Sequence, residues 1–169
     1  MKLNIGAGCR PEKGFKSLDI DPETYPDYLA DLENDDCLKA IKDDSVDEVI
    51  MSHIFEHIRN IHGFMKELYR VCKNGAKIVI TCPYWSHHTA VEDPTHVRFM
   101  TEKSMMYFNK DTTGSDGRHF CKDYDFKVEK ITMYPDAEYA NLPSEELKEA
   151  ASKYLNVIQA VSYTLKVKK

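Results

Sequence analysis

Two short segments near the N-terminus carry residues suited to binding a nucleoside. Residues 3–9 read Leu-Asn-Ile-Gly-Ala-Gly-Cys, and Asp19 and Asp21 follow shortly after a second apolar run. Gly6 and Gly8 allow positive φ angles and let a ligand approach the backbone closely. A carboxylate at the end of the next strand can accept hydrogen bonds from both hydroxyls of a ribose. The pattern therefore predicts a nucleoside pocket at the carboxyl edge of a parallel sheet.

The composition of the glycine turn narrows the choice of nucleoside. A dinucleotide fingerprint would place a third glycine here, at the start of a helix that holds a pyrophosphate. This chain instead has Cys9-Arg10-Pro11, and the stretch before Asp19 is too short for a crossover helix. A cofactor without phosphates needs neither feature, and S-adenosylmethionine is such a cofactor. A glycine turn alone also occurs as a purely structural connection, so this prediction depends on the rest of the chain.

A second group of chemically active residues lies between Pro83 and Arg98, where three of the seven histidines and the only tryptophan occur. The segment follows an apolar run, and open α/β sheets bind ligands beyond the carboxyl ends of their strands. Histidine titrates near neutral pH and can take a proton from a hydroxyl or amine. The candidate bases are His87, His88 and His96, with Asp93 or Glu92 to orient one imidazole. The candidate substrate contacts are Tyr84, Trp85 and Arg98. The alternative is that His96 only bonds the backbone of its loop.

Metal ligands are a further interpretation of the histidines. His53-x-x-Glu56-His57 matches the pattern of inverted zinc proteases, with two imidazoles one helical turn apart. His87, His88, Asp93 and His96 also include nitrogen and oxygen ligands. A glutamate in a first helical turn is, however, favoured by the helix dipole without any metal. The sequence analysis therefore predicts no metal site.

Several regular elements must position these residues. Apolar runs predict strands over 3–6, 16–20, 27–30, 46–51, 78–82, 126–134 and 157–167. Helices are predicted over 35–42, around 64–72 up to Asn74-Gly75, over 101–108 and over 144–154. Ser52 is the expected N-cap of a turn over 53–58. Residues 109–119 are predicted to form a polar, mobile loop. Strands that alternate with helices imply a parallel sheet with helices on both faces.

With these elements in order, residues 3–108 resemble the class I S-adenosylmethionine-dependent methyltransferases. The resemblance is greatest to small methyltransferases associated with surface-polysaccharide gene clusters, and it rests on the glycine turn, the acids Asp19 and Asp31, and the segments 43–57 and 67–83. It implies an α/β, Rossmann-like, doubly wound sheet of seven mostly parallel strands, with helices on both faces and an antiparallel C-terminal hairpin. Residues 1–169 would form one domain, with 83–122 as a substrate-side insert or lid. The third glycine and the usual Pro-Gly-Gly before the fifth strand are missing.

The resemblance also implies roles for individual residues. The backbone at Asn4, Gly6, Ala7 and Gly8 would surround the methionine tail of the cofactor. Asp19 would bind the ribose, with Asp21 as its competitor. Asp31 and Leu32 would contact the adenine, and Ser52 and His53 would line the sulfonium side. An Asp-Pro-x-His-x-Arg segment like residues 93–98 occurs in the resembling enzymes, which favours His96 over His87 and His88 as the base.

Composition excludes several other classes of function. The 169 residues carry a net charge of −5 and no long run of Lys and Arg, so a dedicated nucleic-acid surface is not expected. The five cysteines include no Cys-x-x-Cys pair and are expected to be free thiols in the cytoplasm. No apolar run is long enough for a membrane span.

These observations predict a methyltransferase that acts on a hydroxyl or amine of a small molecule or sugar, with a nucleotide as the second choice of acceptor. Strand one begins at residue 3, so the substrate cover must come from residues 83–122, from a second subunit in a homodimer, or be lacking. A non-catalytic module that binds a nucleoside with the same fold is the main alternative. A metal-dependent enzyme using the His-rich loop is the third.

Overall fold

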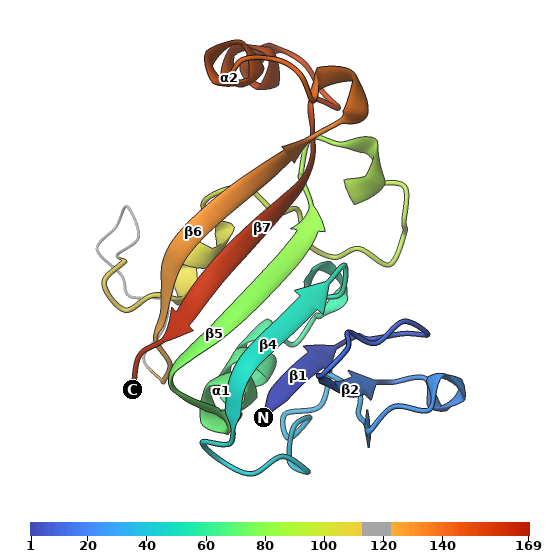
Figure 1. Cartoon of the computed structure of the whole chain (residues 1–169), viewed down its shortest axis with the longest axis vertical. Coiled ribbons are helices and arrows are strands. Elements are labelled where there is room, and N and C mark those ends of the chain that lie inside the picture. The colour runs from blue at the N-terminus through green and yellow to red at the C-terminus, as the bar shows by residue number, and fades with distance from the viewer. Residues whose placement is uncertain (113–122) are drawn as a thin grey trace.

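One mixed β-sheet runs through the computed structural model, which describes residues 1–112 and 123–169 (Figure 1). The strand order is β3-β2-β1-β4-β5-β7-β6. The strands are β1 (Lys2–Ile5), β2 (Lys16–Asp19), β3 (Tyr28–Leu29), β4 (Val46–Ser52), β5 (Cys72–Pro83), β6 (Phe126–Pro135) and β7 (Ile158–Val167). β1 to β5 pair in parallel, and β7 pairs antiparallel with both β5 and β6. The predicted seven-stranded, mostly parallel sheet with antiparallel C-terminal strands is confirmed.

One face of the sheet packs into the hydrophobic core. Leu3, Val49, Ile78 and Leu165 are register partners across β1, β4, β5 and β7, and all four are fully buried. Helix α1 (Ile61–Val71) covers this face with the buried side chains of Phe64, Met65, Leu68 and Val71. The 3₁₀ helix η4 (Ser104–Phe108) lies on the same side, behind the sheet in Figure 1.

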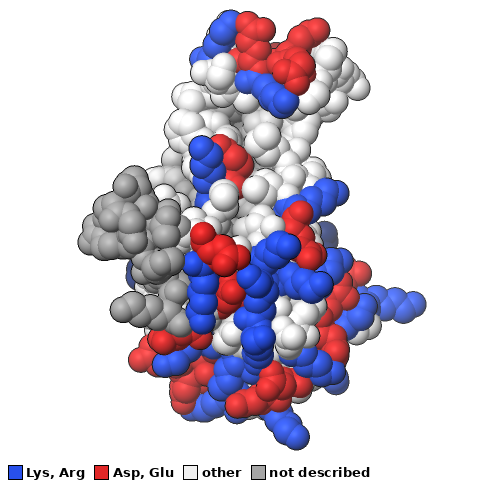
Figure 2. Space-filling model, turned by 90° about the vertical axis from the view of Figure 1, so that its left-hand side faces the viewer, with Lys and Arg blue, Asp and Glu red and all other residues white. Residues whose placement is uncertain are grey.

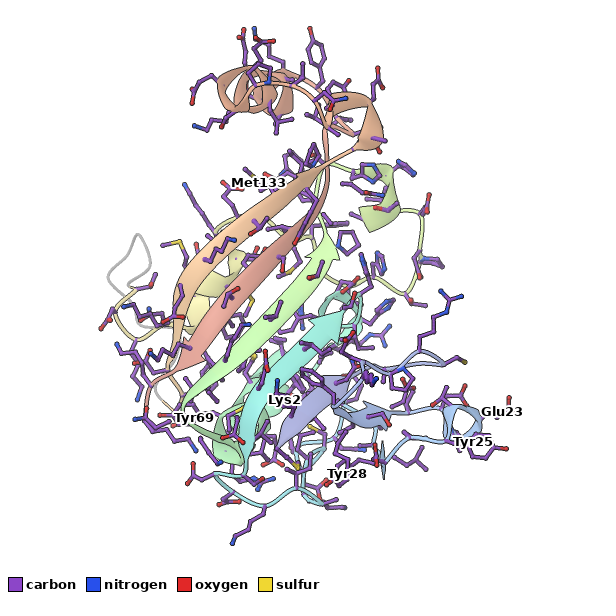
Figure 3. All side chains as sticks on the ribbon, viewed as in Figure 1. Lys2, Glu23, Tyr25, Tyr28, Tyr69 and Met133 are labelled. Carbon is purple, nitrogen blue, oxygen red and sulfur yellow. The ribbon has the colours of Figure 1, made fainter. Side chains whose placement is uncertain are left out.

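The opposite face differs from the prediction, because no helix in the described ranges covers it (Figure 1). Lys2, Glu48, Lys77 and Lys166 are register partners there, one residue out of phase with the core row. Glu48 binds Lys2 at 2.8 Å and Lys77 at 3.3 Å, and Lys2 is labelled in Figure 3. Parallel strands are normally covered on both faces. Here the connection between β1 and β2 has no helix, and cross-strand ion pairs stabilise the exposed row.

Three local predictions also differ from the structure. Residues 35–42 form turns instead of a helix, and the carbonyls of Leu38 and Ile41 accept hydrogen bonds from the Arg70 guanidinium. Ser52 ends β4 and caps no helix, because the 3₁₀ helix η2 (Phe55–His57) that follows has Ile54 at its N-cap. β5 starts at Cys72, directly after α1, so Asn74-Gly75 lies inside a strand, near a break in its register with β4.

Helix α2 (Ser144–Lys153) connects β6 to β7 beyond the end of their hairpin and buries none of its residues. It lies at the top of Figure 1, away from the rest of the sheet. Figure 2 shows charges of both signs at this end of the molecule, above a region with few charges. The predicted loop over 109–119 and the lid over 83–122 fall partly on 113–122, outside the described residues.

Neither α1 nor any other described helix has the length and apolar character of a transmembrane segment. Cys9, Cys37, Cys72 and Cys82 are free thiols, and Cys121 lies outside the described residues. The cytoplasmic location stays a prediction.

Candidate functional site

A pocket of about 180 Å³ opens at the carboxyl ends of β1 and β2. We call it the nucleoside pocket. Four of the predicted cofactor residues line it, namely Gly6, Asp19, Asp31 and Leu32. The side chains of Ile54 and Ile58 add apolar walls that the sequence analysis missed, and no local pattern marks them. Apolar walls beside a carboxylate fit the adenine and ribose of a nucleoside.

The glycine turn has the backbone conformation that its glycines predict, with φ of +66° at Gly6 and +51° at Gly8. The amides of Gly6 and Ala7 donate to the Leu18 carbonyl at 2.9 and 3.2 Å. The Gly8 amide donates to Asp19 Oδ2 at 2.7 Å. These three amides are therefore bonded within the protein, and the turn is held rigidly against the end of β2.

Asp19 and Asp21 have different surroundings. Asp19 lines the nucleoside pocket, and its Oδ1 accepts from the Asp21 amide at 3.0 Å. Asp21 caps the 3₁₀ helix η1 (Pro22–Thr24) by accepting from the Glu23 amide. This placement favours Asp19 over Asp21 for a ribose.

Asn4 and Ser52 are predicted cofactor residues that lie near the pocket and do not line it. Asn4 is buried, and its Oδ1 accepts from the Glu12 amide at 2.9 Å, which fixes the loop after the glycine turn. Ser52 is exposed at the end of β4. Their contact with a cofactor stays a prediction.

Glu33 joins the nucleoside pocket to the start of α1. It lines the pocket, and its carboxylate accepts from the amides of Arg59 at 2.7 Å and Asn60 at 2.9 Å. The sequence analysis did not single out Glu33, because these contacts join segments that are far apart in the chain.

A second pocket of about 420 Å³, the histidine pocket, adjoins the first, and His57 lines both. His53, Glu56, Asp93 and His96 also line it. The structure thus brings the favoured base His96 together with Asp93 and His53. It adds Glu56 and His57 from η2 (Phe55–His57), which the sequence had marked only as a metal-like pattern.

Glu56 is the most unusual group of the histidine pocket. It is 1% exposed, and neither carboxylate oxygen has a hydrogen-bond partner. The nearest imidazole nitrogens are Nδ1 of His53 at 3.5 Å and Nε2 of His96 at 4.0 Å from Oε1. The nearby carboxylate of Glu56 raises the pKa of His53. The backbone of His53 has a positive φ of 54°. Burial is the main reason that the pKa of the Cys82 thiol lies well above its ordinary value, and the charge of Glu56 is the second.

Hydrogen bonds define which nitrogen of each imidazole carries a proton. Nδ1 of His96 lies 3.0 Å from the Ala90 carbonyl, which can only accept, so Nδ1 is protonated. Thr95 Oγ1 donates to Asp93 Oδ1 at 2.6 Å and therefore accepts from Nδ1 of His57 at 2.9 Å. In the neutral rings, Nε2 of both His57 and His96 is left with a free lone pair.

His87 and His88 lie apart from His96, because η3 (His88–Ala90) turns the chain between them. His87 is buried and contacts Thr89 at 2.8 Å and Asp136 at 3.3 Å, whereas His88 is exposed beside Glu92. Together with Trp85 they line a third pocket, on the hairpin side. Their catalytic role stays a prediction that this placement does not favour.

The two remaining substrate candidates make contacts within the protein. The Tyr84 hydroxyl donates to Glu102 at 2.9 Å. Arg98 donates to the carbonyls of Ile58 and Arg59, and it does not line the histidine pocket. Arg98 therefore positions the backbone that follows His57.

Comparison with known proteins found a domain match for part of the chain and a shared fold for nearly all of it. Residues 16–80 match the methyltransferase domain family. An S-adenosylmethionine-dependent methyltransferase from Archaeoglobus fulgidus superposes with a TM-score of 0.61 at 19% identity, over 98% of this chain and 85% of that one. One from Thermotoga maritima gives 0.61 at 15% identity, over 99% and 82%. A search of curated protein sequences found no match.

A third solved structure was determined with its ligands. Phosphoethanolamine N-methyltransferase 1 from Haemonchus contortus, in complex with phosphoethanolamine and S-adenosylhomocysteine, gives a TM-score of 0.59 at 14% identity, over 99% of this chain and 38% of that one. The nucleoside pocket described above provides the apolar and carboxylate groups that an adenosyl cofactor requires. Residues 16–80 thus match a methyltransferase domain, and the whole chain has the fold of solved S-adenosylmethionine-dependent methyltransferases.

Proposed function

We propose that this protein transfers a methyl group from S-adenosylmethionine to a hydroxyl or amine of a small molecule or sugar. One observation carries the proposal: the nucleoside pocket and the histidine pocket meet at His57. A cofactor in the first pocket and an acceptor in the second would therefore be neighbours, and methyl transfer depends mainly on such alignment.

The lining of the histidine pocket supports the choice of acceptor. Its acidic groups are Glu56, Glu92 and Asp93, and no Lys or Arg is among the described residues that line it. An anionic acceptor would be repelled, which disfavours phosphates and hence nucleotides. Carboxylates and imidazoles instead accept hydrogen bonds from the hydroxyls of a sugar or from an amine.

His96 is the residue we assign to proton transfer. S-adenosylmethionine, when bound, would supply an activated methyl carbon, with the neutral thioether S-adenosylhomocysteine as the leaving group. The acceptor oxygen or nitrogen bonds to that carbon as the carbon–sulfur bond breaks, with its electron pair passing to sulfur. The acceptor's proton passes to the free lone pair on Nε2 of His96, while the Ala90 carbonyl holds the ring in place.

Ligand-dependent melting tests the cofactor assignment. Saturating S-adenosylmethionine or S-adenosylhomocysteine should raise the melting temperature by about 5–10 °C, and NAD should not. A shift with NAD alone would contradict the proposal. A shift without methyl transfer to any sugar or amine in a broad panel would favour the non-catalytic module.

Substitution of His96 tests the proton transfer. His96→Ala should lower turnover at least tenfold and leave the melting shift with S-adenosylhomocysteine unchanged, since general-base catalysis contributes about 10²–10⁴-fold. His88→Ala, in the same segment but facing the third pocket, is the matched control and should keep its turnover. Full turnover in His96→Ala would remove His96 from the reaction.

A further inference from the structure

Glu56, His57 and His96 form a cluster in which three side chains direct electron pairs toward the same space. One ligand atom from each of the three lies within 4.8 Å of the other two. The carboxylate of Glu56 is buried and has no hydrogen-bond donor, and the two imidazoles have lone pairs on Nε2. Glu56 is buried and the two imidazoles are half-buried, so the three electron-rich groups repel one another, and a cation among them would stabilise the arrangement.

The outer hydrogen bonds of the cluster are those that orient metal-binding imidazoles. Such a histidine typically donates its other ring N–H to a backbone carbonyl or, directly or through a bridge, to a carboxylate. His96 donates to the Ala90 carbonyl at 3.0 Å. His57 donates to Thr95, whose hydroxyl donates in turn to Asp93. Both rings are therefore fixed with Nε2 available.

We propose that Glu56, His57 and His96 bind a divalent transition-metal ion of the Zn²⁺ class. Two imidazoles and one carboxylate are the ligands of catalytic zinc sites, which keep a further position open. Nitrogen ligands disfavour Mg²⁺ and Ca²⁺, which prefer oxygen. A tetrahedral ion requires its ligand atoms about 3.4 Å apart, so binding would draw the three side chains together by about 1 Å.

The binding of the ion does not depend on the proposed methyl transfer, but its role in catalysis rests on that proposed function. The open position would face the histidine pocket, which His53, Glu92 and Asp93 also line. A hydroxyl of the acceptor bound there would lose its proton more readily, because the ion stabilises the resulting alkoxide. In the metal-loaded protein His96 is then a ligand, and the proton leaves to water or to a neighbouring base in the pocket.

Metal binding by the whole chain, purified without a histidine tag and stripped with a chelator, tests the proposal. Calorimetry with Zn²⁺ should give about one equivalent per chain, and Co²⁺ should give the visible absorption of a tetrahedral site. Mg²⁺ should bind at least a hundredfold more weakly than Zn²⁺. Less than a tenth of an equivalent of Zn²⁺, or equal binding of Zn²⁺ and Mg²⁺, would overturn the proposal.

Matched variants locate the ion. Glu56→Gln and His96→Gln should each weaken Zn²⁺ binding at least tenfold, and His88→Gln should match the wild type. If Glu56→Gln does not fold, His57→Gln replaces it, with circular dichroism as the check. Unchanged Zn²⁺ affinity in the folded variants would show that the ion binds elsewhere. S-adenosylhomocysteine binding, measured in parallel, separates failure of the metal site from failure of the proposed function.

Discussion

At the residue scale, Gly6 is subject to two constraints at once. Its φ of +66° is disfavoured for other residues, and a Cβ there would lie 2.7 Å from Cγ1 of Ile54. Ile54 forms a wall of the nucleoside pocket, so the turn and the wall are in direct contact. Gly8 shares the positive φ but has open space around it.

We expect Gly6→Ala to lower both stability and cofactor affinity. Left-handed backbone costs about 1–2 kcal/mol for a residue with a Cβ, and the displaced Ile54 adds to this. The melting temperature should fall further than in Gly8→Ala, and binding of S-adenosylhomocysteine should weaken at least tenfold. Calorimetric titration and thermal melts of the two variants provide the comparison. Equal behaviour of the two would show that Ile54 yields without cost.

Asp19 has a second role that the sequence did not indicate. Its Oδ2 accepts from the Gly8 amide at 2.7 Å, in addition to the ribose role predicted for it. We expect Asp19→Ala to weaken S-adenosylhomocysteine binding at least tenfold, because both the turn and the ribose contact are lost. Asp21→Ala is the control, since Asp21 caps η1 and does not line the pocket. A titration in which Asp21→Ala shows the larger loss would reverse the assignment.

At the scale of elements, an ion pair between the start of β4 and β5 makes the stability of the fold depend on pH in acid. Asp47 at the start of β4 binds Lys73 of β5 at 2.6 Å. This hydrogen bond and a second one from the N-terminal ammonium, also at 2.6 Å, hold the pKa of Asp47 at about 2, below its ordinary value of 3.8. Because the folded pKa is the lower one, the stabilisation is present above pH 3.8 and is lost as the pH falls toward 2.

Lys73→Met should therefore flatten the acid limb of the stability curve. The variant should melt below the wild type near pH 5, and the difference should shrink between pH 4 and pH 2. Thermal melts over this range measure the effect, and NMR titration of Asp47 should show its pKa moving toward the ordinary value. A constant difference between the two proteins at every pH would mean that Lys73 acts through packing alone.

At the scale of the whole molecule, the uncovered face of the sheet is kept soluble by its charges. Lys2, Glu48, Lys77 and Lys166 occupy one row across four strands. We expect a Lys77→Val, Lys166→Val variant to self-associate, because a broad apolar sheet face is an interaction surface. Light scattering would report its mass, with Lys42→Val, Lys66→Val, away from this row, as the control. A monomer of unchanged solubility would show that the row needs no charges. The predicted homodimer of the wild type stays a prediction.

The positions of most strands and the glycine turn were predictable from sequence because both depend on local signals, whereas the seven-stranded sheet was predicted from the family resemblance. Apolar runs with polar ends mark buried parallel strands, and only glycine tolerates the turn at Gly6. The helix over 35–42 was mispredicted: these residues form turns, and the Arg70 guanidinium donates to the Leu38 and Ile41 carbonyls there. That contact joins segments far apart in the chain and produces no periodic pattern in the sequence.

The sequence by itself determined the strand-end residues of the nucleoside pocket, Gly6, Asp19 and Asp31, because they follow consecutive strands that must end at one edge of a parallel sheet. Only the tertiary structure decided the composition of the histidine pocket. The Val97 amide donates to the Glu56 carbonyl at 3.0 Å, which brings the segment of His96 onto η2. The same fold turns His87 toward Asp136. The resemblance in sequence favours His96 over His87, and long-range packing places the two histidines in different pockets.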